Sequence, residues 1–262
     1  MELYGLIAIL GLIAGLLSGL LGIGGGIVMA PLLLYVPPLF GCAPLSMKVV
    51  AGLTMVQGLA ACLSGGMAHR RFHFVSQGLT LWMGVTIFVA ALVGGAGAKH
   101  VADHLLLALF ALLALVAAGL ICLPTPKDSE APDIALFRFS RPRAVSVAGA
   151  VGLFGGLVGQ GGSFILIPLM TSFMQVPTRI AIGSNLGIVF LASLAGFLGK
   201  ALTGQIAWTL ALPIVLTVIP AAQLGGALSR RVPIAGLRLL LALCIAIAAV
   251  RIGFSALAAG HG

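Results

Sequence analysis

The chain has 262 residues, of which 61% are hydrophobic and only 7% are charged, whereas a soluble domain carries about 25% charged residues. No soluble fold of this size could bury so much apolar surface, so the composition excludes a soluble globular protein and predicts a multi-pass, all-α membrane protein. The net charge of +9 does not indicate nucleic-acid binding, because the basic residues are scattered through short connecting segments, where they set membrane topology. We therefore expect the lipid bilayer, and no nucleic acid, as a partner.

Residues that usually carry catalysis or metal binding are sparse. The sequence contains no nucleotide-binding loop, no His/Cys metal set and no arrangement typical of a catalytic triad. We therefore expect neither an enzyme nor a metal or cofactor site. Four cysteines lie singly in apolar surroundings, without metal-ligand spacing, at Cys42, Cys62, Cys122 and Cys244.

The first half of the chain is a succession of apolar segments. Its N-terminal segment lacks a basic leader and a clear cleavage site, so we expect a retained helix and not a signal peptide. The cluster Gly22–Gly26 then interrupts the apolar run, and the next piece is long enough for only half a crossing before Pro37 and Pro38 end it. The predicted segments are residues 3–21, 27–36, 47–68, 77–98 and 104–123.

The second half repeats the order of the first after a polar, proline-rich stretch. A second glycine cluster occupies Gly159–Ser163, and Pro168 takes the place of Pro31. The predicted segments are residues 144–162, 163–175, 178–200, 207–229 and 233–256. We expect an N-terminal transmembrane repeat at residues 1–123, a polar cytoplasmic linker at 124–143 and a C-terminal transmembrane repeat at 144–262.

Both glycine clusters are predicted to break a helix inside an apolar run. Each interior glycine costs a helix about 1 kcal/mol relative to alanine, and a break at membrane depth must be buried in protein or line a cavity. A helix that begins at such a break presents free N–H groups and the positive end of its dipole, which suits an anion. We predict that the N–H groups of Gly24–Ile27 and Gly161–Phe164 bind an anion near the midplane. The alternative is that the glycines only allow close helix packing.

Polar side chains near the two clusters extend this candidate site. Hydroxyl and amide groups can donate to an oxyanion without placing a fixed charge in the membrane, although they also bond neighbouring carbonyls. No Asp or Glu lies in the middle of an apolar segment, which argues against a cation pump. Lys48 and Arg179 open matching segments and either attract anions at the two mouths or reach the headgroups. The predicted substrate-binding residues are Gly24, Gly25, Gly26, Ile27, Thr54, Gln160, Gly161, Gly162, Ser163 and Asn185.

Two topologies fit the apolar segments, with eight to ten membrane passes in total. If each broken segment crosses once, the repeats are parallel and the 14 Lys and Arg residues divide 8 to 6 between the two sides. If the two pieces at each break form a hairpin, each half has five passes, the repeats are inverted and the division is 10 to 4. The positive-inside rule favours the inverted arrangement. Its less basic side holds Lys48, Lys99, Lys200 and Arg251.

The doubled glycine motif resembles a known family. The pattern G-x-x-x-G-L-[LV]-G-x-G-G-[GS]-x4-P occurs at Gly15–Pro31 and again at Gly152–Pro168, and the elements AGLT and IGSN follow at residues 51–54 and 182–185. Over nearly the whole chain this is similar to the TauE/SafE sulfite exporter family. The resemblance implies an integral membrane permease for small, often sulfur-containing anions. Gln160 and Ser163 depart from the apolar or glycine residues of the family pattern.

We therefore expect a secondary transporter in the bacterial inner membrane that moves sulfite, an organosulfonate or a related sulfur oxyanion by alternating access. Two alternatives stay open at this point. One is a permease for a metal or a thiol compound, and the other is a membrane scaffold or biogenesis protein without a substrate. The oligomeric state is open as well, a homo-oligomer included.

Overall fold

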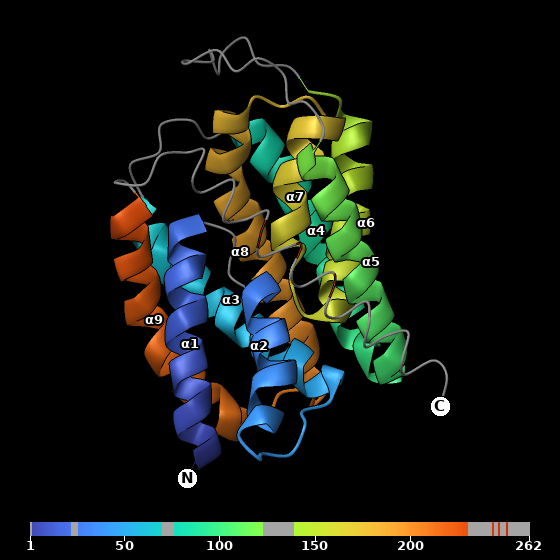
Figure 1. The fold of residues 1–262 in the computed structure, drawn as a ribbon. Helices are drawn as coiled ribbons and strands as arrows, with labels where there is room; N and C mark the ends of the chain where they lie inside the picture. Colours follow the sequence, from blue (N-terminus) through green and yellow to red (C-terminus); the bar gives the residue numbers. More distant parts are fainter. Residues whose placement is uncertain are drawn as a thin grey trace.

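The computed structural model describes residues 2–21, 26–69, 76–122 and 139–229, together with the single residues 243, 246 and 250. Within these ranges the regular elements are all helical (Figure 1). They are α1 (Glu2–Leu21), α2 (Gly26–Leu39), α3 (Met47–His69), α4 (Gln77–Gly97), the 3₁₀ turn η1 (Ala98–His100), α5 (Asp103–Cys122), α6 (Arg141–Val158), α7 (Ser163–Pro168), the π-helical turn η2 (Leu169–Phe173), α8 (Thr178–Leu202) and α9 (Trp208–Ser229). The segment predicted at 233–256 and most of the linker at 124–143 fall outside the described residues.

Six of the described helices are long and apolar enough to cross a membrane: α1, α3, α4, α5, α8 and α9. Their outward faces are apolar, as on α4, where Leu81, Val85 and Val89 are exposed at a spacing of four residues. Such a stripe is costly in water and suits a surface covered by lipid. These features confirm the multi-pass, all-α membrane protein predicted from the composition.

Two of the apolar helices are too short to cross a membrane. The helix α2 has 14 residues, about 21 Å, and the run from Ser163 to Phe173 is shorter still, against a hydrocarbon core of about 30 Å. The prediction that Pro37 and Pro38 end the first short helix was wrong, since α2 continues to Leu39. Each of these prolines removes only its own N–H bond to the carbonyl four residues earlier, and Phe40 N–H donates to Pro37 O at 3.1 Å.

The helix pair α1 and α9 is packed through small residues and runs in parallel. An ideal Cβ on Gly11 would lie 3.5 Å from Ile214 Cα, and one on Gly19 would lie 2.1 Å from Ala222 O. Residue numbers therefore rise together along both helices. The small residues of α1 allow the two backbones to touch.

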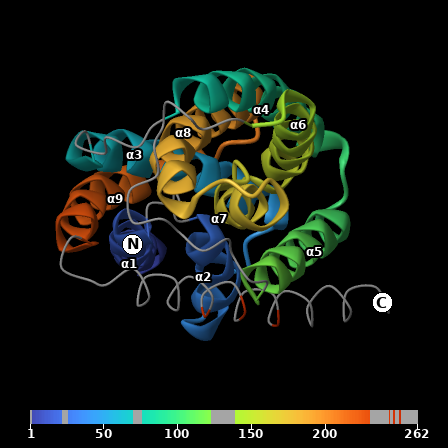
Figure 2. The ribbon, with the colours of Figure 1, turned by 90° about the horizontal axis from the view of Figure 1, so that it is seen from above.

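The pair α4 and α6 is packed in the same way, and these two pairs have the most extensive helix contacts in the described fold (Figure 2). An ideal Cβ on Gly152 would lie 2.8 Å from Ile87 O, and one on Gly156 would lie 2.5 Å from Ala91 O. The helices α4 and α6 are thus also parallel, and their backbones are in direct contact.

The two parallel pairs run in opposite directions. The helix α8 runs along α4, since Gly84 faces Leu191 and Gly95 faces Gly196. A five-residue connection, Thr203–Ala207, then turns the chain back into α9. Because α1 follows α9 and α6 follows α4, α1 and α6 are antiparallel to each other (Figure 1).

The second broken segment is a hairpin. An ideal Cβ on Gly155 would lie 2.3 Å from Gly162 N, and one on Gly162 would lie 2.0 Å from Val151 Cγ1. The chain therefore folds back along α6 after the break, as the hairpin alternative requires of this half. Seen from above, α7 lies within the surrounding helices (Figure 2), and its residues Ser163–Leu166 are buried.

Candidate functional site

The second glycine cluster breaks the helix where the sequence predicted. The helix α6 ends at Val158 and α7 begins at Ser163. Between them Gly159, Gly161 and Gly162 have φ angles of 83°, 57° and 72°. Residues other than glycine rarely adopt this left-handed backbone conformation. The turn therefore needs glycine for its backbone angles as well as for its small size.

Thr54 of α3 fastens this turn to the rest of the bundle. Its hydroxyl lies 2.7 Å from Gly159 O, with Val50 O and Ala51 O at 3.0 and 3.2 Å as further acceptors. An ideal Cβ on Gly159 would lie 2.2 Å from Ala51 O, so α3 and the break are in backbone contact. Thr54, predicted to bind substrate, thus uses its one proton on carbonyl groups of the protein and positions the break.

Replacing Thr54 with valine is expected to loosen this contact. The substitution keeps the shape of the side chain and removes the hydrogen bond to Gly159 O, which is worth about 1 kcal/mol inside a membrane protein. The free energy of unfolding in detergent should fall by about that amount, whereas Thr54→Ser should retain most of it. Equal stabilities for the valine and serine variants would contradict this role.

The first glycine cluster is only partly placed. Residues 22–25, including the predicted donors Gly24 and Gly25, lie outside the described residues. The next two residues, Gly26 and Ile27, begin α2 and are buried.

The side chain of Gln160 brings the two breaks together. An ideal Cβ on Gly26 would lie 2.2 Å from Gln160 Oε1 and 3.3 Å from Gln160 Nε2. The amide of the second break therefore lies against the first turn of α2, 134 residues earlier in the chain. Glycine at position 26 lets the amide lie directly against the backbone, so the two sequence clusters predicted to form one site meet at this contact.

Three buried amide side chains have no hydrogen-bond partner among the described residues: Gln57, Gln160 and Asn185. All three are buried, and both the oxygen and the nitrogen of each amide are unpaired. Buried polar groups are nearly always hydrogen-bonded, and an unpaired amide costs about 1–3 kcal/mol. An unpaired buried amide can donate to and accept from a polar ligand.

Backbone donors at the second break are partly engaged. Gly161 N–H donates to Gly155 O at 3.1 Å, and Ser163 N–H donates to Gln160 O at 3.3 Å. Two of the N–H groups predicted to bind an anion thus stabilise the turn itself. The amide of Gln160 and the N–H groups that open α2 are further donors where the two breaks meet.

The predicted residue Asn185 lies farther away than the residues of the second break. Gly161 approaches Ser193 on α8, with 3.1 Å between an ideal Cβ and the hydroxyl oxygen. Asn185 precedes Ser193 by eight residues, which is about 12 Å along the helix. Asn185 therefore lies at a different depth from Gln160, next to Ser184, whose hydroxyl accepts a hydrogen bond from Ser76 N–H.

Lys48 and Arg179 open helices that begin at opposite ends of the bundle. The helices α3 and α8 are antiparallel, because Met55 packs on Gly196 while Gly52 packs on Gln205, after the end of α8. The Lys48 ammonium donates to Lys99 O at 3.1 Å, so it caps the end of η1. The side chain of Arg179 lies outside the description.

Sequence reasoning placed Gln57 outside the candidate site, although it is fully buried and unpaired. A signal was present, because Gln57 follows Thr54 by three residues and so shares its helix face. Among the described residues, no three His, Cys, Asp or Glu side chains are grouped so that they could hold a metal ion.

Comparison with known proteins decides the family. Residues 7–252 match the family described as sulfite exporter TauE/SafE. The chain belongs to this family. The match confirms the resemblance that the doubled glycine motif indicated. The TauE/SafE family is a family of membrane transporters.

Relatives of the TauE/SafE chain come from several different organisms. It is 25% identical to the probable membrane transporter protein YunE of Bacillus subtilis, over 86% of this chain and 88% of the relative. It is 30% identical to a probable membrane transporter protein of Xylella fastidiosa, over 84% and 82% of the two chains. The probable membrane transporter protein MJ0441 of Methanocaldococcus jannaschii is 22% identical over 90% of each chain. No solved structure matches the chain.

Proposed function

We propose that this TauE/SafE chain is a secondary transporter that moves sulfite, an organosulfonate or a related sulfur oxyanion across the bacterial inner membrane. The observation that carries the proposal is the contact between Gln160 and Gly26, which joins the two broken segments through an unpaired amide. The substrate binds at this contact, and alternating access takes place around it, as in transporters built from discontinuous helices.

The chemistry of this contact favours an anion over a cation. The amide nitrogen of Gln160 carries two N–H donors, and α2 begins at Gly26 with the positive end of its dipole. The apolar segments contain no acidic residue in their middle, so a cation would find no counter-charge at this depth. An oxyanion instead gains charge-assisted hydrogen bonds.

We also propose that residues 1–123 and 144–262 are inverted repeats. In support, each half contributes its first helix to a parallel pair with the fourth helix of the other half, α1 with α9 and α6 with α4. These pairs run in opposite directions, as inversion requires. The 10 to 4 division of basic residues then places the linker at 124–143 in the cytoplasm.

Uptake into proteoliposomes tests the proposed activity. The purified wild-type chain is expected to catalyse uptake of radiolabelled sulfite, and an unlabelled organosulfonate should reduce that uptake by competition. Protein-free liposomes give the background, and radiolabelled rubidium tests a monovalent cation. Folded protein that moves neither sulfite nor an organosulfonate above background would contradict the proposal.

A further inference from the structure

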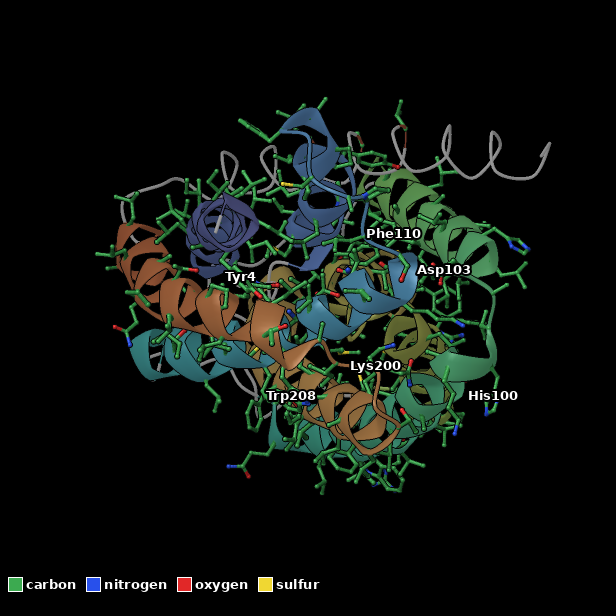
Figure 3. All side chains as sticks on the ribbon, turned by 90° about the horizontal axis from the view of Figure 1, so that it is seen from below. Tyr4, His100, Asp103, Phe110, Lys200 and Trp208 are labelled. Carbon is green, nitrogen blue, oxygen red and sulfur yellow. The ribbon has the colours of Figure 1, made fainter. Side chains whose placement is uncertain are left out.

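Lys200 is a fully buried lysine in the last turn of α8. Its ammonium donates one hydrogen bond, at 3.3 Å, to Leu157 O in the last turn of α6. Viewed from below, Lys200 lies near the middle of the bundle, whereas His100 lies at the edge (Figure 3). This position differs from that of a lysine that only marks topology, because such a side chain reaches the headgroups.

The charge of Lys200 has no counter-charge in the described fold. An ammonium carries three N–H donors, and burying an ion costs several kcal/mol unless a partner is present. No described carboxylate forms an ion pair with it, and the carboxylate of Asp103 accepts a hydrogen bond from Met47 N–H. The acidic residues of the whole chain are Glu2, Asp103, Asp128, Glu130 and Asp133.

The surroundings of Lys200 are rich in backbone carbonyls. The parallel helices α4, α6 and α8 all end at this level, since Gly199 packs on Leu92 O and Gln205 Nε2 donates to Gly95 O at 2.9 Å. Helix C-termini carry partial negative charge, which repels an approaching anion. An ammonium group among them offsets this repulsion.

Lys200 also lies next to the break. Its acceptor, Leu157 O, precedes Gly159 by two residues. At the same end of the bundle, the partly exposed Lys48 donates to Lys99 O. Lys200 therefore lies close to the break, at the end of the bundle where Lys48 lies.

We propose that Lys200 is an anion subsite, at which the ammonium pairs directly with the transported oxyanion between the Lys48 end of the bundle and the Gln160 contact. This inference rests on the proposed transport of an oxyanion. The free N–H groups of Lys200 supply the charge and the hydrogen bonds, and the substrate supplies the counter-charge that the protein lacks. The other role open to Lys200 is structural, as a cap on the C-terminus of α6.

Two substitutions separate the subsite from the cap. Lys200→Gln removes the charge and leaves an amide that can donate to Leu157 O, whereas Lys200→Met removes both. The matched control is Lys99→Met, which removes an exposed ammonium at the same end of the bundle. For each variant in detergent, titration calorimetry measures sulfite affinity and a melting curve without sulfite measures stability.

A subsite predicts that sulfite affinity falls at least tenfold in both Lys200→Gln and Lys200→Met, and that Lys99→Met binds like the wild type. The melting temperature without sulfite should stay equal or rise, because an unpaired buried charge has been removed. Should the methionine variant fail to fold, the glutamine variant carries the same test.

Wild-type affinity in Lys200→Gln would overturn the subsite while leaving the proposed transport intact. A wild-type chain that neither binds nor moves sulfite or an organosulfonate would overturn the proposed function, and the subsite with it. Loss of affinity together with a lower melting temperature in Lys200→Met, with both restored in Lys200→Gln, would assign the cap and overturn the subsite.

Discussion

Replacing Gln160 with glutamate is expected to lower sulfite uptake more than 100-fold. The substitution is nearly isosteric, but it puts a carboxylate against Gly26, where we propose that the substrate anion binds. The anion would lose a charge-assisted hydrogen bond, worth about 1.5–3 kcal/mol, and would meet a like charge in a buried site. Gln160→Leu removes the hydrogen bond without repulsion, and its uptake should fall about 10- to 100-fold.

The measurement is the initial rate of sulfite uptake in proteoliposomes at a concentration below KM. Gln77→Glu is the matched control, because Gln77 is exposed at the start of α4 and the substitution makes the same chemical change. Its uptake should match that of the wild type. Wild-type rates in both Gln160 variants would exclude Gln160 from the site.

Gly159→Ala is expected to destabilise the fold by about 2–5 kcal/mol. Alanine in the left-handed region costs about 1–2 kcal/mol, and φ of Gly159 is 83°. The added Cβ would also lie 2.2 Å from Ala51 O and 2.4 Å from Ala51 Cα. Backbone atoms cannot move aside as a side chain can, and overpacking of this kind costs about 1–3 kcal/mol more. Because the Thr54 bond ends on the same residue, uptake should be lost as well.

Gly204→Ala separates the two causes. The φ of Gly204 is 69°, but nothing lies within 4 Å of an ideal Cβ there. The control therefore keeps the conformational cost and removes the collision, so its free energy of unfolding should fall by only about 1–2 kcal/mol. Denaturant titration in detergent compares the two variants. Equal losses of stability would show that the contact with Ala51 is unimportant.

The long helices among the described residues are predictable because each is an apolar run bounded by polar residues or glycine. The bounds of α1, α3 and α4 agree with the predicted segments to within two residues. The break at Gly159–Ser163 is predictable for a local reason as well, since clustered glycines disfavour a helix wherever they occur. Pro37 and Pro38 were misjudged because each removes only its own hydrogen bond to the carbonyl four residues earlier, and α2 still continues to Leu39.

Which residues form the candidate site depends on contacts between segments that are distant in the sequence. Local sequence patterns do not indicate these contacts. Nothing near Gln160 in the sequence indicates that its amide lies against Gly26, and nothing near Thr54 indicates that its hydroxyl is used on Gly159 O. The burial of Lys200 was missed for the same reason. A lysine at the end of an apolar segment ordinarily reaches the membrane surface, and only the packing of α4 and α6 around α8 encloses this one.

The most direct test of an anion site between the two breaks is to locate a bound oxyanion. Selenite has the charge and geometry of sulfite, and selenium can be located by its anomalous scattering in crystals of the wild-type chain soaked with selenite. We expect a selenium peak within hydrogen-bonding distance of the Gln160 amide and the first turn of α2, and we expect sulfite in the soak to displace it. Selenium peaks confined to surface lysines and arginines, with the Gln160 contact empty at saturating selenite, would contradict the anion site.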